Sequence, residues 1–139
     1  MAETPTKTGV IGSPINHSLS PSIHNYWIEK NKIKTDVYQK IKIDALELNK
    51  KIHNLKNDNF IGLNVTIPLK ELAYNICEEL SETSKKLKAV NTLTFKKGKV
   101  IGNNTDPKGF INSIDDKIKN TNIIKKNVLV VLSLIHISE

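Results

Sequence analysis

Three short apolar runs, each followed by a cluster of polar side chains, constrain the fold of this chain more than any other feature. The runs lie at residues 8–12, 60–65 and 100–102 and are rich in valine and isoleucine. Hydroxyl, amide and charged groups follow each run, as they do where a buried strand leads into a functional loop. Since an α/β sheet collects side chains beyond its strand ends, this pattern predicts one pocket at that edge.

The rest of the chain alternates strand-like and helix-like periods, which predicts an α/β fold: a three-layer sandwich with a mixed, mostly parallel sheet. A hairpin around Gly98 is expected to supply its antiparallel edge. The expected strands are Lys7 to Gly12, Val37 to Ile43, Phe60 to Val65, Val90 to Phe95, Val100 to Gly102 and Val128 to Leu132. The expected helices run from Pro21 to about Lys30, from Asp44 past Leu55, from Pro68 to Leu80, from Ser81 to Lys88 and from about Pro107 to Lys119. Ser20 and Asp44 are placed to cap helices, and Trp27 is expected in the core.

Composition narrows the class of protein. With 139 residues and 38% hydrophobic content, the chain can bury one core. The net charge is +7, but every basic residue is lysine and none is arginine, which argues against a nucleic-acid partner. A single cysteine, Cys77, indicates a reducing compartment such as the cytoplasm, and no apolar run is long enough to predict a membrane span.

Individual polar residues have ordinary structural explanations when each is taken alone. Lys70 is expected at the start of a helix, where the helix dipole disfavours a cation, but it is one of many lysines. Asp106 precedes Pro107 and suits a turn or a helix cap. Ser18 and Ser20 suit a loop and a cap in the same way. Only their combination indicates a site.

Four blocks in the chain together resemble shikimate dehydrogenase, from about Gly9 to Leu132. The blocks read Gly-Val-Ile-Gly-Ser-Pro-Ile-Asn-His-Ser-Leu-Ser-Pro-Ser-Ile-His-Asn from Gly9, Gly-Leu-Asn-Val-Thr-Ile-Pro-Leu-Lys from Gly62, Ala-Val-Asn-Thr from Ala89 and Gly-Asn-Asn-Thr-Asp-Pro-Lys-Gly from Gly102. The resemblance implies an NADP-dependent enzyme of aromatic amino acid and chorismate biosynthesis. Its reaction would be the reversible reduction of 3-dehydroshikimate to shikimate.

The resemblance also implies roles for individual residues. Lys70 and Asp106 match the catalytic pair, with Lys70 as the acid or base and Asp106 as its partner. The implied substrate-binding residues are Ser18 and Ser20 at the carboxylate, and Asn64, Thr66, Asn91 and Asp106, with Lys70, at the ring hydroxyls. His24 is interpreted as helix packing and His17 as a residue that orients its loop. We expect no metal site, and the sequence assigns no oligomeric state.

The resemblance changes at the C-terminus. Residues 127–132 resemble the first strand of the family's NADP-binding domain, but no glycine follows Gly109, so we expect no cofactor-binding residue in this chain. The expected division is a shikimate-binding domain at 1–126, that strand at 127–132, and an atypical, non-native tail at 133–139. We expect weak shikimate binding and no activity from the chain alone. A relative that uses quinate or NAD, and a non-catalytic shikimate-binding remnant, stay open as alternatives.

Overall fold

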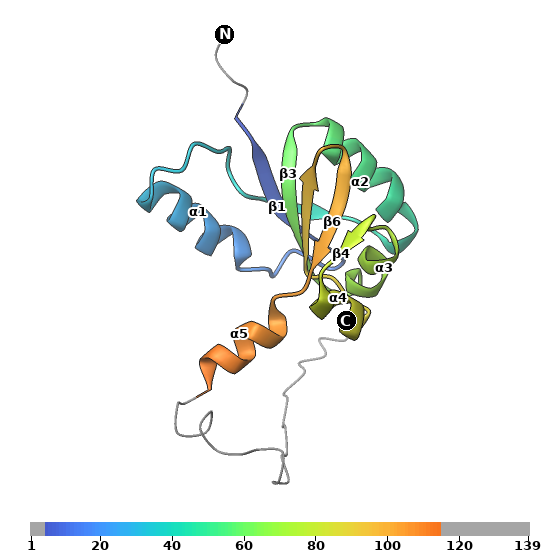
Figure 1. Cartoon of the computed structure of the whole chain (residues 1–139). Coiled ribbons are helices and arrows are strands. Elements are labelled where there is room, and N and C mark those ends of the chain that lie inside the picture. The colour runs from blue at the N-terminus through green and yellow to red at the C-terminus, as the bar shows by residue number, and fades with distance from the viewer. Residues whose placement is uncertain (1–4, 115–139) are drawn as a thin grey trace. The chain divides into compact units, whose positions relative to one another are not determined.

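A computed structural model describes residues 5–114, which form a six-stranded mixed sheet, a 3-10 turn and five α-helices (Figure 1). The strands are β1 (Lys7–Gly12), β2 (Gln39–Lys42), β3 (Phe60–Val65), β4 (Glu79–Leu80), β5 (Thr92–Lys96) and β6 (Lys99–Asn103). The helices are α1 (Ser20–Lys30), the 3-10 turn η1 (Ala45–Glu47), α2 (Leu48–Asn57), α3 (Lys70–Asn75), α4 (Glu82–Leu87) and α5 (Asp106–Ser113). The predicted α/β class is confirmed.

The strand order in the sheet is β2-β1-β3-β5-β6-β4. Among the described strands, β1 runs parallel to both β2 and β3, and β4 runs parallel to β6. Strand β5 is antiparallel to β3 and to β6. Three of the five pairs are therefore parallel, and the sheet is mixed as expected. Residues up to Asp106 form one compact unit, to which all six strands belong.

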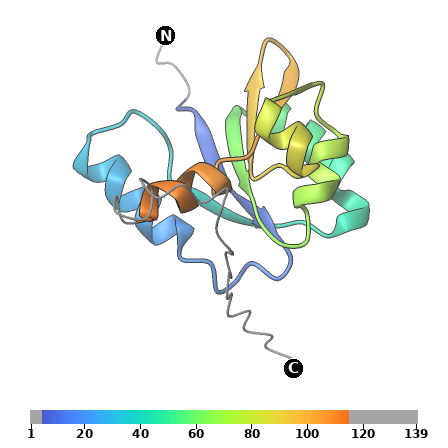
Figure 2. The ribbon, with the colours of Figure 1, turned by 60° about the horizontal axis from the view of Figure 1, so that its bottom comes forward.

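One face of the sheet is closely packed. In Figures 1 and 2, α2, α3 and α4 lie on the side of the sheet opposite to α1. Strands β1, β3 and β5 contribute Ile11, Leu63 and Leu93 to the buried cluster, and α2 adds Leu48 and Ile52 one turn apart. The other members are Ile43, Phe60, Val65, Leu69, Ala73, Val90 and Val100. This cluster holds twelve of the fifteen buried hydrophobic residues in the described part of the chain.

The face toward α1 is much less filled. Its buried cluster holds Val10, Ile15 and Tyr38, with Ile28 of α1 packed against it. A cavity of about 430 Å³ opens beside this cluster, lined by residues of α1, β1, β3 and β5. The same strands therefore present a dense surface on one side and an open one on the other.

Two predictions for α1 are wrong. Trp27 is 49% exposed rather than in the core. His24 and Ile28, one turn apart, line the cavity against the sheet. Trp27 lies about 100° round the helix from Ile28, and it therefore points away from the sheet-facing side that Ile28 occupies. Ser20 is the first residue of α1 and not its cap, because the cap position is Leu19, whose side chain makes no capping hydrogen bond. Instead, the Ser20 N–H donates to Ser18 Oγ at 3.3 Å.

The second strand is shorter than the predicted Val37 to Ile43. Val37 is 61% exposed, because it lies in the loop before pairing with β1 begins at Gln39. Tyr38, in contrast, is buried toward α1. Asp44 occupies the cap position of η1 but makes no capping hydrogen bond. Its Oδ1 accepts a hydrogen bond from Ser13 Oγ at 2.8 Å, so the carboxylate ties the segment after β2 to the loop after β1.

The predicted helix from Pro68 to Leu80 is also wrong. Helix α3 begins at Lys70 and ends at Asn75, and the chain then forms β4, which pairs with β6. This pairing satisfies backbone groups that a longer helix would have satisfied internally. Strand β4 therefore forms the edge of the sheet that the Gly98 hairpin was expected to form. Helix α4 begins as expected, because Ser81 Oγ accepts a hydrogen bond from the Ser84 N–H at 3.1 Å.

Other predictions fall partly or wholly outside the described residues. Helix α5 covers the first part of the expected helix from Pro107 to Lys119. The strand Val128 to Leu132, the domain boundary at 126/127 and the tail 133–139 lie beyond residue 114. Among the residues that are described, no helix has the length and apolarity that crossing a bilayer requires.

Candidate active site

The loops after β1 and β3 are held against each other at the ends of these strands. The Thr66 N–H donates to the Ile11 carbonyl at 3.0 Å, and the Ser13 N–H donates to the Ile67 carbonyl at 3.2 Å. A Cβ atom at Gly12 would lie 2.6 Å from Thr66 Cγ2 and 2.9 Å from the Ile67 carbonyl oxygen. Only glycine fits this contact without a shift of the backbone. We call residues 13–19, after β1, the serine loop and residues 66–69, after β3, the lysine loop. These two loops therefore form one structural unit.

Lys70 is the first residue of α3 and is paired with Asp106. Its Nζ donates to Asp106 Oδ2 at 2.6 Å, and the two side chains are 34% and 54% exposed. The Lys70 carbonyl accepts a hydrogen bond from the Val90 N–H at 2.9 Å, which fixes the backbone behind the ammonium group. The carboxylate offsets the unfavourable position of a cation at a helix start. The structure thus joins the two residues predicted as the catalytic pair.

Asp106 is held in its ionised form. Burial acts to raise the pKa of this carboxyl, but hydrogen bonds from Lys70 and Asn91 and the positive charge of Lys70 outweigh it. The pKa of Asp106 therefore lies below the ordinary value for aspartate. The carboxylate is a hydrogen-bond acceptor for both neighbours at neutral pH.

Asn91 fixes the position of that carboxylate. It is nearly buried, and its Nδ2 donates to Asp106 Oδ1 at 2.7 Å and to Thr105 Oγ1 at 2.9 Å. Its Oδ1 accepts hydrogen bonds from the Thr105 N–H and from Thr92 Oγ1, at 3.1 and 2.9 Å. The buried Asn104 adds a second support, because its Oδ1 accepts from the Asp106 N–H at 3.1 Å. Asp106 is thus positioned by a preformed hydrogen-bond network.

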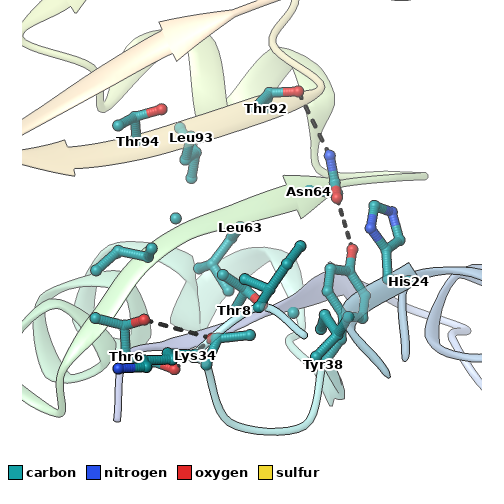
Figure 3. Close-up of a pocket in the computed structure, with 16 residues that line it drawn as sticks. Thr6, Thr8, His24, Lys34, Tyr38, Leu63, Asn64, Thr92, Leu93 and Thr94 are labelled. Carbon is teal, nitrogen blue, oxygen red and sulfur yellow. Dashed lines mark hydrogen bonds between the residues drawn. The ribbon is translucent and has the colours of Figure 1, made fainter. Parts of the chain in front are cut away.

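Asn64 joins this network from β3, on the face toward α1. Figure 3 shows its amide between Tyr38 and Thr92. Tyr38 Oη donates to Asn64 Oδ1 at 2.6 Å, and Asn64 Nδ2 approaches Thr92 Oγ1 at 3.5 Å. The sequence analysis missed Tyr38, Thr92 and Thr105. The one signal available for Tyr38 was that an aromatic residue alternates with Lys40 and Lys42 in the predicted strand.

The remaining predicted site residues line a second cavity, which shares no lining residue with the cavity beside Asn64. Ser18, Ser20 and Thr66 line a space of about 310 Å³, together with the exposed His17. Lys70 lines a neighbouring space of about 380 Å³ with Pro68 and Glu71. Ile67 borders both spaces, so the space lined by the hydroxyl side chains and the space lined by Lys70 meet at this residue.

This arrangement suits a small polyol that carries a negative charge. Short hydroxyl side chains on a loop can donate to an anion, and the amides offer both donors and acceptors to hydroxyl groups. An ammonium group held by a carboxylate can give or take a proton when a neighbouring carbonyl becomes a hydroxyl.

Comparison with known proteins agrees with this geometry. The family model described as shikimate dehydrogenase substrate binding domain matches residues 10–93. The chain belongs to the shikimate dehydrogenase family. The match contains the predicted site residues Ser18, Ser20, Asn64, Thr66, Lys70 and Asn91, whereas Asp106 lies beyond it.

Individual relatives support the same family. The chain is 41% identical over 120 residues to the shikimate dehydrogenase (NADP⁺) of Pelagibacter ubique, a match of 86% of this chain and 45% of the relative. It resembles the crystal structure of the Aquifex aeolicus shikimate dehydrogenase with a TM-score of 0.78 and 36% identity, covering 86% of this chain and 44% of that one. The Thermus thermophilus enzyme, solved in complex with shikimate, gives a TM-score of 0.73 and 31% identity over 77% and 40% of the two chains. The chain therefore spans less than half the length of these relatives.

Proposed function

We propose that this chain is the substrate-binding part of an NADP-dependent shikimate dehydrogenase, which interconverts 3-dehydroshikimate and shikimate. The observation that carries the proposal is the Lys70 Nζ to Asp106 Oδ2 contact of 2.6 Å, beside the hydroxyl cluster of the serine loop. The family match and the NADP-dependent relatives support it. A cytoplasmic location also belongs to the proposal, on the support of the single free cysteine.

In this proposal Lys70 exchanges the proton at the reacting oxygen. When the substrate carbonyl is reduced, its oxygen needs a proton, and the Lys70 ammonium is the donor; in the reverse direction the amine takes the proton from the hydroxyl. Asp106 holds the ammonium in place through Oδ2, while Asn91 holds Oδ1. The carboxylate also accepts a hydrogen bond from the substrate hydroxyl.

The other proposed contacts follow the chemistry of each side chain. Ser18, in the loop before α1, and Ser20, the first residue of α1, donate hydrogen bonds to the substrate carboxylate. Asn64, Thr66 and Asn91 contact the ring hydroxyls. A pocket built on such hydrogen bonds discriminates against analogues that lack a hydroxyl, because the protein's polar groups would be left unpaired.

The described residues contain no glycine-rich turn before a helix of the kind that could hold the pyrophosphate of NADP. Gly9, Gly12, Gly62 and Gly102 lie in strands, and a Cβ on any of them would come within 3.0 Å of another atom. Gly98 lies in the turn between β5 and β6, and Gly109 lies inside α5. The bound cofactor supplies the hydride in this reaction. We assign none of its contacts to residues 5–114.

The proposal is tested by titrating shikimate into the 139-residue chain and following the ¹⁵N–¹H spectrum. We expect shifts at the amides of the serine loop and around Lys70, and weaker binding by Lys70→Ala. Lys85→Ala is the matched control, because it breaks the ion pair with Glu82 on the exposed α4. A chain whose spectrum does not change with shikimate would overturn the proposal. Quinate titrated in parallel tests the alternative substrate: equal or stronger binding would favour the quinate-using relative.

A further inference from the structure

We propose that Tyr38 is a positioning residue that determines which atoms of Asn64 face the substrate. This inference rests on the proposed function, because it takes Asn64 as a residue that contacts a ring hydroxyl. Tyr38 contacts Asn64 through its hydroxyl, on the side toward α1, and acts through this contact (Figure 3).

The hydrogen bonds around Asn64 all run in one direction. Tyr38 Oη donates to Asn64 Oδ1, Asn64 Nδ2 donates to Thr92 Oγ1, and Thr92 Oγ1 donates to Asn91 Oδ1. Asn91 Nδ2 then donates to Asp106 Oδ1, while Lys70 donates to the second oxygen of the same carboxylate. We call the series Tyr38, Asn64, Thr92, Asn91 and Asp106 the donor chain. It begins at a phenol and ends at a carboxylate, which is acceptor-only when it is ionised.

Tyr38 is itself firmly held. Its side chain is buried, and the imidazole of His24 stacks on the phenol ring with centroids 4.2 Å apart and planes within 7°. Asn25 brackets its backbone, since Asn25 Oδ1 accepts from the Tyr38 N–H at 2.7 Å and Asn25 Nδ2 donates to the Tyr38 carbonyl at 3.2 Å. Two consecutive residues of α1 thus fix the position from which the hydroxyl reaches Asn64.

The consequence is a fixed orientation of the Asn64 amide. Its oxygen is occupied by the Tyr38 hydroxyl, so the amide presents N–H groups at its other end. One N–H points toward Thr92 at the long distance of 3.5 Å, which leaves Asn64 able to donate to an oxygen of a ligand. Without the phenol hydroxyl, the amide can turn over and present its oxygen instead. Burial raises the pKa of Tyr38, so the hydroxyl keeps the proton that it donates.

Tyr38→Phe tests this inference, because it removes the hydroxyl and keeps the ring that stacks on His24. In the chain without ligand, we expect the Asn64 side-chain NH₂ signals to move in the ¹⁵N–¹H spectrum. We expect shikimate binding to weaken roughly tenfold, the loss of about one well-oriented hydrogen bond. Tyr26→Phe is the matched control, because Tyr26 lies on α1 beside Asn25 and is 56% exposed. Asn64 NH₂ signals that are unchanged in Tyr38→Phe would overturn the inference.

A double-mutant cycle separates positioning from a general structural effect. In an Asn64→Ala background, Tyr38→Phe should no longer weaken shikimate binding, because the residue through which it acts is gone. The same loss in both backgrounds would contradict a positioning role. If Tyr38→Phe fails to fold, the unsubstituted chain decides: a nuclear Overhauser effect from the Tyr38 hydroxyl proton to the Asn64 amide supports the bond, and its absence overturns it.

The two proposals fail differently. If the chain does not bind shikimate but Tyr38→Phe still moves the Asn64 signals, the proposed function is wrong and the control of the amide by Tyr38 stands. If the chain binds shikimate and Tyr38→Phe binds it equally well, the positioning role is wrong and the proposed function stands.

Discussion

The two faces of the sheet use the same strands for different purposes. Toward α2, β1, β3 and β5 present Ile11, Leu63 and Leu93, which are at most 3% exposed and belong to a large apolar cluster. Toward α1, β3 and β5 present Asn64 and Thr92 beside a cavity of about 430 Å³. Since side chains alternate along a strand, each strand carries both sets. One face therefore supplies stability, and the other is free to hold polar groups.

The largest expected effect is a loss of activity with little change in the free energy of unfolding. In the chain joined to the C-terminal remainder of a relative, Lys70→Ala should lower kcat by about 10²- to 10⁴-fold, because it removes the proton donor, and should change ligand affinity far less. The free energy of unfolding should change by less than about 1 kcal/mol, since the ion pair with Asp106 is partly exposed. Steady-state kinetics and urea unfolding measure the two effects. Equal losses in kcat and in affinity would contradict the proton-transfer role.

The opposite result is expected on the packed face. Ile11→Ala should lower the free energy of unfolding by about 2 to 5 kcal/mol, because it leaves a cavity in the apolar cluster. Ile61→Ala is the matched control, because Ile61 is on β3 but 45% exposed, and it should cost well under half as much. Urea unfolding followed by circular dichroism gives both values. Similar losses of unfolding free energy for the two variants would contradict the distinction between the two faces.

An intermediate effect is expected where the two loops meet. Gly12→Ala should lower the free energy of unfolding by about 1 to 3 kcal/mol, because the added Cβ would crowd Thr66 Cγ2 and the Ile67 carbonyl. Gly109→Ala is the control, since no atom lies within 4 Å of its Cβ position and alanine favours a helix. We expect the control to be neutral or slightly stabilising. Thermal unfolding of both variants checks the comparison, and a neutral Gly12→Ala would contradict the close approach.

The smallest expected effect is the pH dependence of Asp106. Because its pKa is lower in the folded chain than in the unfolded chain, the carboxyl adds stability above the ordinary aspartate pKa of about 4. This contribution should be lost as the pH falls below that value and through the lower pKa of the folded chain. The difference in unfolding free energy between the unsubstituted chain and Asp106→Asn should therefore shrink toward low pH. A difference that stays constant in urea unfolding from pH 6 to pH 3 would contradict the lowered pKa.

The sequence predicted the features that depend on local pattern. Strands β1 and β3 have the bounds predicted from their valine-rich and isoleucine-rich runs, and the resemblance to the family led to the pairing of Lys70 with Asp106. Strand β4 could not be predicted, because two residues carry no periodicity and their strand exists only through pairing with β6. The exposure of Trp27 was missed for a similar reason: a helical pattern shows which residues share a face, but not which face meets the sheet.

The link from Tyr38 to Asn64 was beyond the sequence for the same physical reason. The two residues are 26 positions apart, and their contact depends on the parallel pairing of β1 with both β2 and β3. His24 was expected to be a packing residue, and it does pack, but its partner is the phenol ring of Tyr38 rather than the Trp27 face alone. Side-chain networks of this kind follow from tertiary structure and leave little trace in local composition.

The glycine contact between the two loops also limits how this site can change over evolutionary time. An insertion beside Gly12 or Ser13 would break the Ser13 to Ile67 bond or move the chain away from Thr66, and either change would displace the lysine loop as well. Insertions and deletions are therefore costly routes to a new ligand here. Replacement of single side chains at a constant loop length is the route that the architecture leaves open.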